Sequence, residues 1–392
     1  MPIAVFALAL CAFAIGLTEF VVAGLLPNIA TDLHASIPAA GLLVSGYALG
    51  VVIGAPLLTA LTGTVERRRL LTGLMTLFLF GSVVSALAPG YGVLMLGRIL
   101  AALAHGAFMG VGIVAAGELV PADKRGRALS LVISGATLAT VLGVPFGTLI
   151  GQQLGWRATF WIVAVCAAVG LAGVATLVPR AERAAQGDLR TEFTTLRQPQ
   201  VLLVLLITVL GFGGVMTSYT FIAEMATRVT GFASGSVIWI TMLFGLGTVV
   251  GNLASGRFTD RYPRAAVPVA LGLLALVLAV LTLAIHDKAA TCVTVFLFGA
   301  AAFGTLAPLQ MRVMAKAQAA PTLASATNVA AFNLANTVGP LLGGALLNAG
   351  FGYPTLNLAG ALVTATGLTV ALRSLAAERP RTIPAEPALI TA

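Results

Sequence analysis

Twelve apolar segments run through this chain, separated by short connections that hold most of its charged residues. A helix of about 20 apolar residues spans the roughly 30 Å hydrocarbon core of a bilayer. Lipid offers no hydrogen-bond partners, so such a segment must satisfy its own backbone polar groups, as an α-helix does. The sequence therefore predicts an all-α integral membrane protein with 12 transmembrane helices. The predicted helices cover residues 4–27, 38–61, 70–88, 91–117, 128–151, 159–178, 201–222, 234–254, 266–285, 290–312, 325–347 and 354–372.

The composition excludes several other classes of protein. Charged residues make up 9% of the chain and hydrophobic residues 59%, whereas about 25% of a soluble protein is charged. The net charge of +9 does not indicate a nucleic-acid partner, because the basic residues are spread over many connections. The cysteines and histidines are dispersed, and the sequence has no nucleotide-binding or hydrolase motif. We therefore expect no metal, no cofactor, no ATP-driven transport and no enzymatic activity.

Lysine and arginine residues set the expected orientation. Most of the 22 basic residues lie in every second connection and in the C-terminal tail. Cytoplasmic loops carry such an excess of positive charge. Both termini are therefore expected in the cytoplasm.

The chain also divides into two similar parts. The longest polar stretch, residues 179–200, separates two sets of six segments. Residues 138–147 resemble residues 334–343, half a chain length later. Parallel repeats with a site between them are typical of transporters that rock between two states. We expect a six-helix bundle at 1–178, a cytoplasmic linker at 179–200, a second six-helix bundle at 201–373 and a cytoplasmic tail at 374–392.

Glu19 is the only charged residue in the first apolar segment. An ionised carboxylate at the centre of a membrane helix costs about 2.5–3.5 kcal/mol, so such residues are usually functional. No residue one turn away on the same helix can pair with it. We interpret Glu19 as a proton or substrate site. The structural alternative is a protonated glutamate that bonds a backbone carbonyl and locks two helices.

Arg98 and His105 lie in the fourth apolar segment. Seven helical residues separate them, so their side chains lie about 20° apart on one face. We expect this pair to shape proton coupling at Glu19. The alternatives are an Arg98 side chain that reaches the membrane interface and a neutral His105 that bonds a backbone carbonyl.

Glycine and proline residues cluster in the fifth and eleventh segments. Proline removes a hydrogen bond and bends a helix, while glycine lets two backbones touch. These residues predict hinges that repack between two states, with ordinary helix packing as the alternative. The expected hinge residues are Gly143, Pro145, Gly147, Gly339 and Pro340.

A compact charged turn follows the eighth segment. Asp260 can bond the start of the next helix, and Arg261 and Arg264 can reach facing elements. With Gly256, these residues predict a latch on the cytoplasmic side; a plain topology signal is the alternative. Other polar residues on apolar helices are weaker candidates for a substrate cavity: Tyr47, Asn252, Gln310, Asn333 and Asn336.

Over nearly its whole length the chain resembles the major facilitator superfamily, in its drug:H+ antiporter family. Gly256-x-x-x-Asp260-Arg261-x-x-Arg264 is similar to the loop signature of that superfamily, and residues 143–147 to the antiporter motif. In the equivalent connection between the second and third segments, Gly63–Thr64 stands where the aspartate is expected. Further matches resemble the arabinose-efflux-like and chloramphenicol-resistance branch: residues 16–20, 45–50, 97–98, 105–108, 155–157 and 310–314.

This resemblance implies a proton-coupled transporter of the bacterial inner membrane that exports drugs, sugars or nucleosides. Its partners would be a small-molecule substrate, protons and the lipid bilayer, and we expect it to act as a monomer. An importer of the same fold is one alternative. A membrane sensor or scaffold that transports nothing is another, although a scaffold needs neither Glu19 nor the Arg98–His105 pair.

Overall fold

The computed structural model describes residues 1–61, 65–121, 124–180, 198–317 and 321–377, and every element in these ranges is helical. Twelve stretches of the described chain are long and apolar enough to cross a membrane. The predicted fold class and the number of spans are therefore confirmed.

The first six spans contain α1 (Ile3–Asp32), α2 (Ile37–Leu61), α3 (Arg67–Ala86), α4 (Tyr91–Glu118), α5 (Arg125–Leu138), η2 (Ala139–Gly143), α6 (Val144–Leu154) and α7 (Trp156–Leu177). One span is formed by α5, η2 and α6 together. The last six spans, with their connections, contain α9 (Pro199–Tyr219), α10 (Ile222–Glu224), η3 (Met225–Val229), η4 (Ser234–Ser236), α11 (Val237–Arg261), α12 (Pro263–Ala284), α13 (Lys288–Gly304), α14 (Leu306–Lys316), α15 (Pro321–Asn348) and α16 (Pro354–Ala377). Here α13 and α14 share one span.

α1 extends beyond its predicted end. The sequence predicts that Pro27 closes the first segment, but Pro27 lies inside α1, which continues to Asp32. Proline is tolerated in membrane helices because neighbouring helices and side chains satisfy the backbone group that it frees. The extra turn brings Asp32 to the far end of the span.

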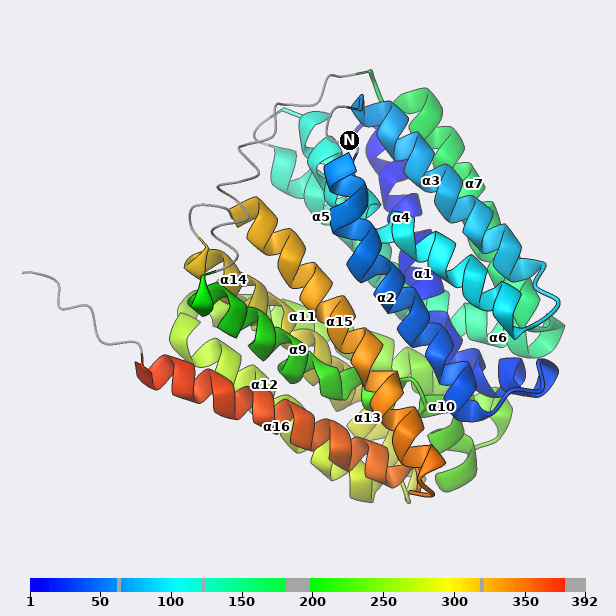
Figure 1. Ribbon diagram of the computed structural model, residues 1–392, viewed down its shortest axis with the longest axis vertical. Coiled ribbons are helices and arrows are strands. Elements are labelled where there is room, and N and C mark those ends of the chain that lie inside the picture. The colour runs from blue at the N-terminus through cyan, green and yellow to red at the C-terminus, as the bar shows by residue number, and fades with distance from the viewer. Residues whose placement is uncertain (62–64, 122–123, 181–197, 318–320, 378–392) are drawn as a thin grey trace, which may run out of the picture.

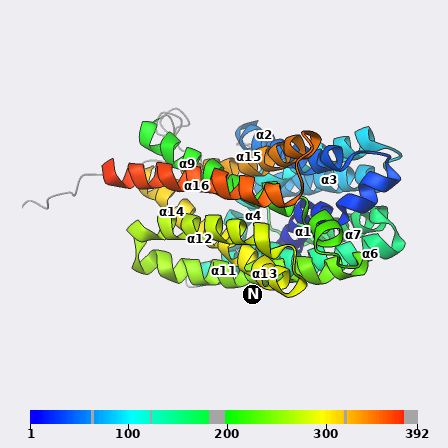
Figure 2. The same ribbon diagram turned by 90° about the horizontal axis from the view of Figure 1, so that it is seen from below.

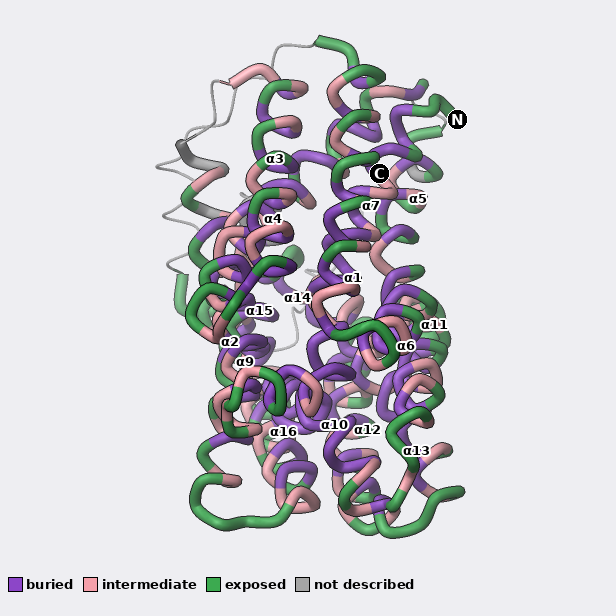
Figure 3. Tube along the Cα trace, turned by 90° about the vertical axis from the view of Figure 1, so that its right-hand side faces the viewer, coloured by how far each residue is buried: buried purple, intermediate pink, exposed green. Residues whose placement is uncertain are grey.

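Each set of six spans packs mainly within itself. α1 is buried along most of its length and lies against α5, α6 and α7, while α3 contacts α4 and α7 (Figure 3). In the other set, α9 contacts α15 and α16, and α11 contacts α13. Figures 1 and 2 show the two sets side by side. The domain boundaries stay a prediction, because residues 181–197 and 378–392 lie outside the described residues.

The two sets meet mostly near one end of the molecule. We call the end where α2 begins and α15 ends the contact end, and the end where α7 ends and α9 begins the linker end. α2 packs against α15, and α1 packs against α10. The helices of the two sets diverge toward the linker end, at the upper left of Figure 1. The Ser45 hydroxyl donates to the Thr337 carbonyl oxygen at 2.8 Å across this contact.

Phe221 fills the contact between the two sets. Its ring is fully buried between Gly41 of α2 and Gly343 of α15. A Cβ atom placed on Gly41 would come 3.0 Å from the Phe221 ring, and one on Gly343 would come 2.6 Å from it. The two glycines therefore leave the room that the ring occupies.

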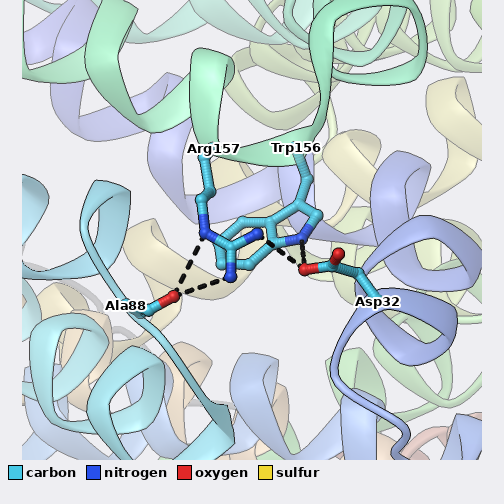
Figure 4. Close-up of polar contacts among 4 residues, drawn as sticks. All are labelled: Asp32, Ala88, Trp156 and Arg157. Atoms are coloured by element: carbon cyan, nitrogen blue, oxygen red, sulfur yellow. Dashed lines mark hydrogen bonds and ion pairs between the residues drawn. The ribbon is translucent and has the colours of Figure 1, made fainter.

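A polar cluster fastens the contact end of the first six spans (Figure 4). Asp32 Oδ2 accepts from Arg157 Nη1 at 2.6 Å and from Trp156 Nε1 at 3.0 Å. Arg157 Nε and Nη2 donate to the buried Ala88 carbonyl oxygen at 3.1 and 2.8 Å. The Arg157 guanidinium also lies 4.2 Å from the centre of the Trp156 ring. One arginine thus ties the start of α7 to the end of α1 and to the residues after α3.

We expect Arg157→Ala to lower the stability of the first six spans. The Asp32 pair is half exposed and contributes little, but losing two bonds to the buried Ala88 carbonyl should cost about 1–3 kcal/mol. Thermal unfolding of the detergent-purified protein measures the change. Arg127→Ala, which removes an exposed arginine from the start of α5, is the control. Equal stability of the two variants would contradict a structural role for Arg157.

Candidate functional site

Glu19 lies in the middle of α1, and its side chain is partly exposed. Within the described residues, its carboxylate takes part in no hydrogen bond or ion pair. The alternative of a glutamate that locks two helices through a backbone carbonyl is therefore not what the structure shows. Glu19 is an unpaired acid that other groups can reach.

Arg98 of α4 is the charged group next to Glu19, and the two interact electrostatically. Arg98 is 1% exposed, so its side chain does not reach the membrane interface. Its Nη1 atom donates to the Thr18 carbonyl oxygen and lies 3.3 Å from Thr18 Oγ1, and its Nε donates to the Leu43 carbonyl oxygen at 3.4 Å. Its Nη2 atom is buried and has no hydrogen-bond partner within the described ranges. The guanidinium is thus fixed by α1 and α2 while one nitrogen stays available.

Tyr47 connects Arg98 to His105. The Arg98 guanidinium carbon lies 4.2 Å from the centre of the Tyr47 ring, a distance typical of a cation–π contact. The Tyr47 hydroxyl lies 3.2 Å from His105 Nδ1. His105 is therefore bonded to a side chain rather than to the backbone carbonyl that the alternative expects. The structure brings Glu19, Arg98, Tyr47 and His105 into one polar group on α1, α2 and α4.

An aromatic group from the other set reaches this site. Phe20, beside Glu19 in the chain, lies edge-on to Tyr219 of α9 at 6.3 Å between ring centres. It lies equally far from Phe303 of α13. Tyr219 stacks on Phe244 at 4.1 Å, and in the part of the chain that the structure describes its buried hydroxyl has no hydrogen-bond partner. Sequence reasoning missed Tyr219, although the criterion that selected Tyr47, a polar residue on an apolar helix, applies to it equally.

The remaining cavity candidates do not form one site. Asn333 and Asn336 lie on the buried face of α15, and each has a buried Oδ1 atom for which the described residues supply no partner. Gln310 instead accepts from Asn328 at 2.8 Å, and Asn328 in turn accepts from Thr208, so these residues join helices. Asn252 is partly exposed on α11, where its carbonyl oxygen accepts from Ser255. Of this group, Asn333 and Asn336 best retain the character of a binding surface.

The hinge predicted at residues 143–147 coincides with a change in helix type. η2 is a π-helical turn between α5 and α6, and Pro145 lies in the first turn of α6. Gly143 and Gly147 contact α1, and η2 also touches α11 of the other set, where Gly245 faces the Thr140 carbonyl oxygen. π-helical turns are rare and occur frequently at functional sites. In contrast, α15 runs unbroken through Gly339 and Pro340.

The predicted latch is not closed in this conformation. Asp260 is exposed near the end of α11, and within the described residues it makes no ion pair or hydrogen bond. Arg261 Nε donates to the neighbouring Tyr262 hydroxyl at 3.0 Å, and Arg264 is exposed. In the equivalent connection of the first set, Gly63–Thr64 lies outside the described residues, while Arg67 forms an ion pair with Glu118. The latch stays a prediction about another conformation.

A cavity of about 510 Å³ lies between the two sets at the contact end. It is lined by Asp32 of α1, Gln152 of α6 and Glu224 of α10 among other residues. Glu224 is 2% exposed, forms an ion pair with Arg228 and lies 3.5 Å from the Tyr353 hydroxyl. Burial, together with the nearby Glu224 carboxylate, raises the pKa of Tyr353, so its hydroxyl keeps the proton. Sequence reasoning missed Glu224, which lies just beyond the seventh predicted segment.

Comparisons with known proteins agree with this architecture. A family model of the Major Facilitator Superfamily matches residues 8–233 and 219–390. The inner membrane transport protein YdhP of Escherichia coli (strain K12) is 40% identical over 377 residues, which cover 96% of this chain and 97% of YdhP. The chloramphenicol resistance protein of Streptomyces lividans is 40% identical over 390 residues, covering 98% of this chain and 97% of that protein. The crystal structure of the nucleoside transporter NupG has a TM-score of 0.77 at 11% identity, with 95% of this chain and 99% of NupG covered, which shows a shared fold.

Proposed function

The chain belongs to the Major Facilitator Superfamily and is a membrane transporter, and from this premise we propose that it exports small molecules in exchange for protons. We place both termini in the cytoplasm, so that the contact end faces outward and the linker end faces inward. One chain carries both sets of six spans, so we propose that it works as a monomer.

The observation that carries this proposal is the unpaired Glu19 beside a fixed Arg98. A carboxylate inside a membrane protein is energetically costly, so it usually performs a function that an apolar residue cannot perform. Glu19 is partly exposed and has no hydrogen-bond or ion-pair partner among the described residues, and it lies next to a guanidinium with one nitrogen that is likewise unpartnered there. This arrangement suits a group that exchanges a proton while the neighbouring cation receives a polar group of the substrate.

The proposed cycle couples the two events through Arg98. When Glu19 is ionised, its charge attracts Arg98; when Glu19 is protonated, that attraction is lost and Arg98 can bind the substrate. The aromatic contact from Phe20 to Tyr219 and Phe303 crosses between the two sets. Protonation of Glu19 therefore takes place beside the Phe20 contacts, which must rearrange when the two sets move relative to each other. Asn333 and Asn336 would complete the substrate site from α15.

The direction of proton movement tests the proposal. The purified protein is placed in vesicles with its linker end outward and an acidic interior, and candidate substrates are added outside while an internal dye reports pH. Chloramphenicol is the first compound to test, because a relative that is 40% identical is a chloramphenicol resistance protein; a nucleoside and a sugar follow. We expect an added substrate to make the interior more alkaline, because a proton leaves as substrate enters.

The other readings give different results in the same assay. A proton-coupled importer of the same fold would make the interior more acidic, since substrate and proton would move together. A sensor or scaffold would move neither radiolabelled substrate nor protons. The assay uses compounds to which this chain gives an efflux-deficient host resistance. Either result with such a compound would contradict exchange with protons.

A further inference from the structure

A basic pocket of about 390 Å³ lies at the linker end, where α3 begins and α7 ends. Its polar lining includes Arg68, Arg69 and Thr72 of α3 and Arg180, which follows α7. These two helices pack together at the edge of the molecule that faces away from the last six spans (Figure 1). The pocket is therefore distant from the Glu19 site and faces the surroundings of the protein.

The charges that line the pocket favour an anion. Three arginines face one carboxylate, Glu66, which pairs with Arg69 at 3.1 Å. Arg68 and Arg180 remain to bind a ligand. The first turn of α3 adds to this attraction, because its N-cap residue Glu66 makes no capping hydrogen bond with its side chain. Free N–H groups and the positive end of the helix dipole at such a terminus bind phosphate groups well.

The position of the pocket adds a requirement for apolar contact. Both α3 and α7 are membrane spans, so their shared end lies at the boundary between the hydrocarbon and the head groups. The exposed Leu177 side chain ends α7 close to the pocket, and Gly73 leaves open space on the α3 side. A ligand that carries both a phosphate and an acyl chain can satisfy the arginines and also cover this apolar surface. A free phosphate ion can satisfy only the arginines.

We propose that this pocket binds the phosphate of an anionic membrane lipid, with Arg68 and Arg180 as the principal ligands. Basic pockets between membrane helices on the cytoplasmic side are suited to anionic head groups. The volume accommodates a head group while the acyl chains lie along α3 and α7. The lipid would thereby join the start of the third span to the end of the sixth.

Binding of a short-chain fluorescent phosphatidylglycerol to the detergent-purified full chain tests this proposal. We expect Arg68→Gln/Arg180→Gln to weaken binding about 30-fold, because two cations near the phosphate are lost. Arg68→Lys/Arg180→Lys keeps both charges and should restore most of the affinity. Arg125→Gln/Arg127→Gln is the matched control, since it removes two exposed arginines from the same end of the same six spans. Gel filtration checks that each variant is folded.

Two competitors distinguish the source of the phosphate. Unlabelled phosphatidylglycerol should displace the probe, whereas zwitterionic phosphatidylcholine and millimolar inorganic phosphate should not. Displacement by inorganic phosphate would overturn the lipid assignment, and equal displacement by phosphatidylcholine would show that head-group charge is not recognised. Equal losses in the site and control variants, or native affinity in Arg68→Gln/Arg180→Gln, would also refute the proposal.

Discussion

Glu19→Gln should abolish proton exchange while leaving a folded protein that still binds substrate. Glutamine keeps the size of the side chain and one hydrogen-bond acceptor but removes the group that titrates. In the substrate-driven assay, the pH change of the vesicle interior should fall to the level of protein-free vesicles. Substrate binding, measured separately, should persist because Arg98 and its bonds to Thr18 and Leu43 remain. Glu19→Asp should retain partial activity with a shifted pH profile.

Glu224→Gln is the matched control for this experiment. Glu224 is another carboxylate next to an arginine, but it is buried, lines the cavity at the contact end and is already paired with Arg228. We expect Glu224→Gln to keep proton exchange at the native ratio of protons to substrate. Loss of exchange in Glu224→Gln with retention in Glu19→Gln would move the proton site to that cavity.

Phe221→Ala should shift the protein toward the conformation that opens the contact end. Truncation of a buried phenylalanine costs about 3–5 kcal/mol. Phe221 contacts Gly41 only in the conformation in which α2 and α15 meet. The loss of that contact therefore destabilises this conformation alone. A loss of about 1–3 kcal/mol from one state changes the ratio of the two states about 5- to 150-fold.

Spin labels at the exposed positions Ser36 and Ala349 measure this shift, because they lie at the adjoining ends of α2 and α15. The three native cysteines are first replaced by alanine. We expect a longer distance between the labels to become well populated in Phe221→Ala. Phe160→Ala is the control: Phe160 is equally buried but packs on Trp156 within the first six spans. If both variants lose stability and neither changes the distance, Phe221 is only a packing residue.

Hydropathy predicted the helical fold class and the number of spans correctly, and the reason is physical. Lipid forces each apolar segment to satisfy its own backbone, so the number and type of elements depend on local sequence. The same argument found Glu19 and Arg98, because an isolated charge within a membrane helix is conspicuous. Arg98 and Glu19 influence each other electrostatically, while their role in proton coupling stays a proposal.

The rest of the site depends on contacts that no local pattern encodes. Tyr47 bonds His105 although 58 residues separate them, and Phe221 fits between two glycines from opposite sets. Gln310 illustrates the opposite error: a polar residue on an apolar helix can satisfy another buried side chain instead of a substrate. Tyr47 and Gln310 are both polar residues on apolar helices, so the sequence treats them alike. Only the packing of the helices distinguishes their roles.

The π-helical turn η2 affects how the span formed by α5, η2 and α6 can vary in length. Gly135, Ala139, Gly143, Gly147 and Gly151 are spaced four residues apart, and all of them face α1. In a regular α-helix, positions four apart run about 40° ahead of a full turn at each step, so five of them would wind away from a straight neighbour. η2 takes more residues per revolution and corrects this phase midway along the span. Deletion of one residue there would remove about 100° of rotation, but the return of the π turn to regular α-helix would restore most of it, so Gly147 and Gly151 would still face α1. The extra residue is therefore absorbed by η2, and a relative that lacks it can keep the second half of the span in contact with α1 when its alignment places a one-residue gap at this turn.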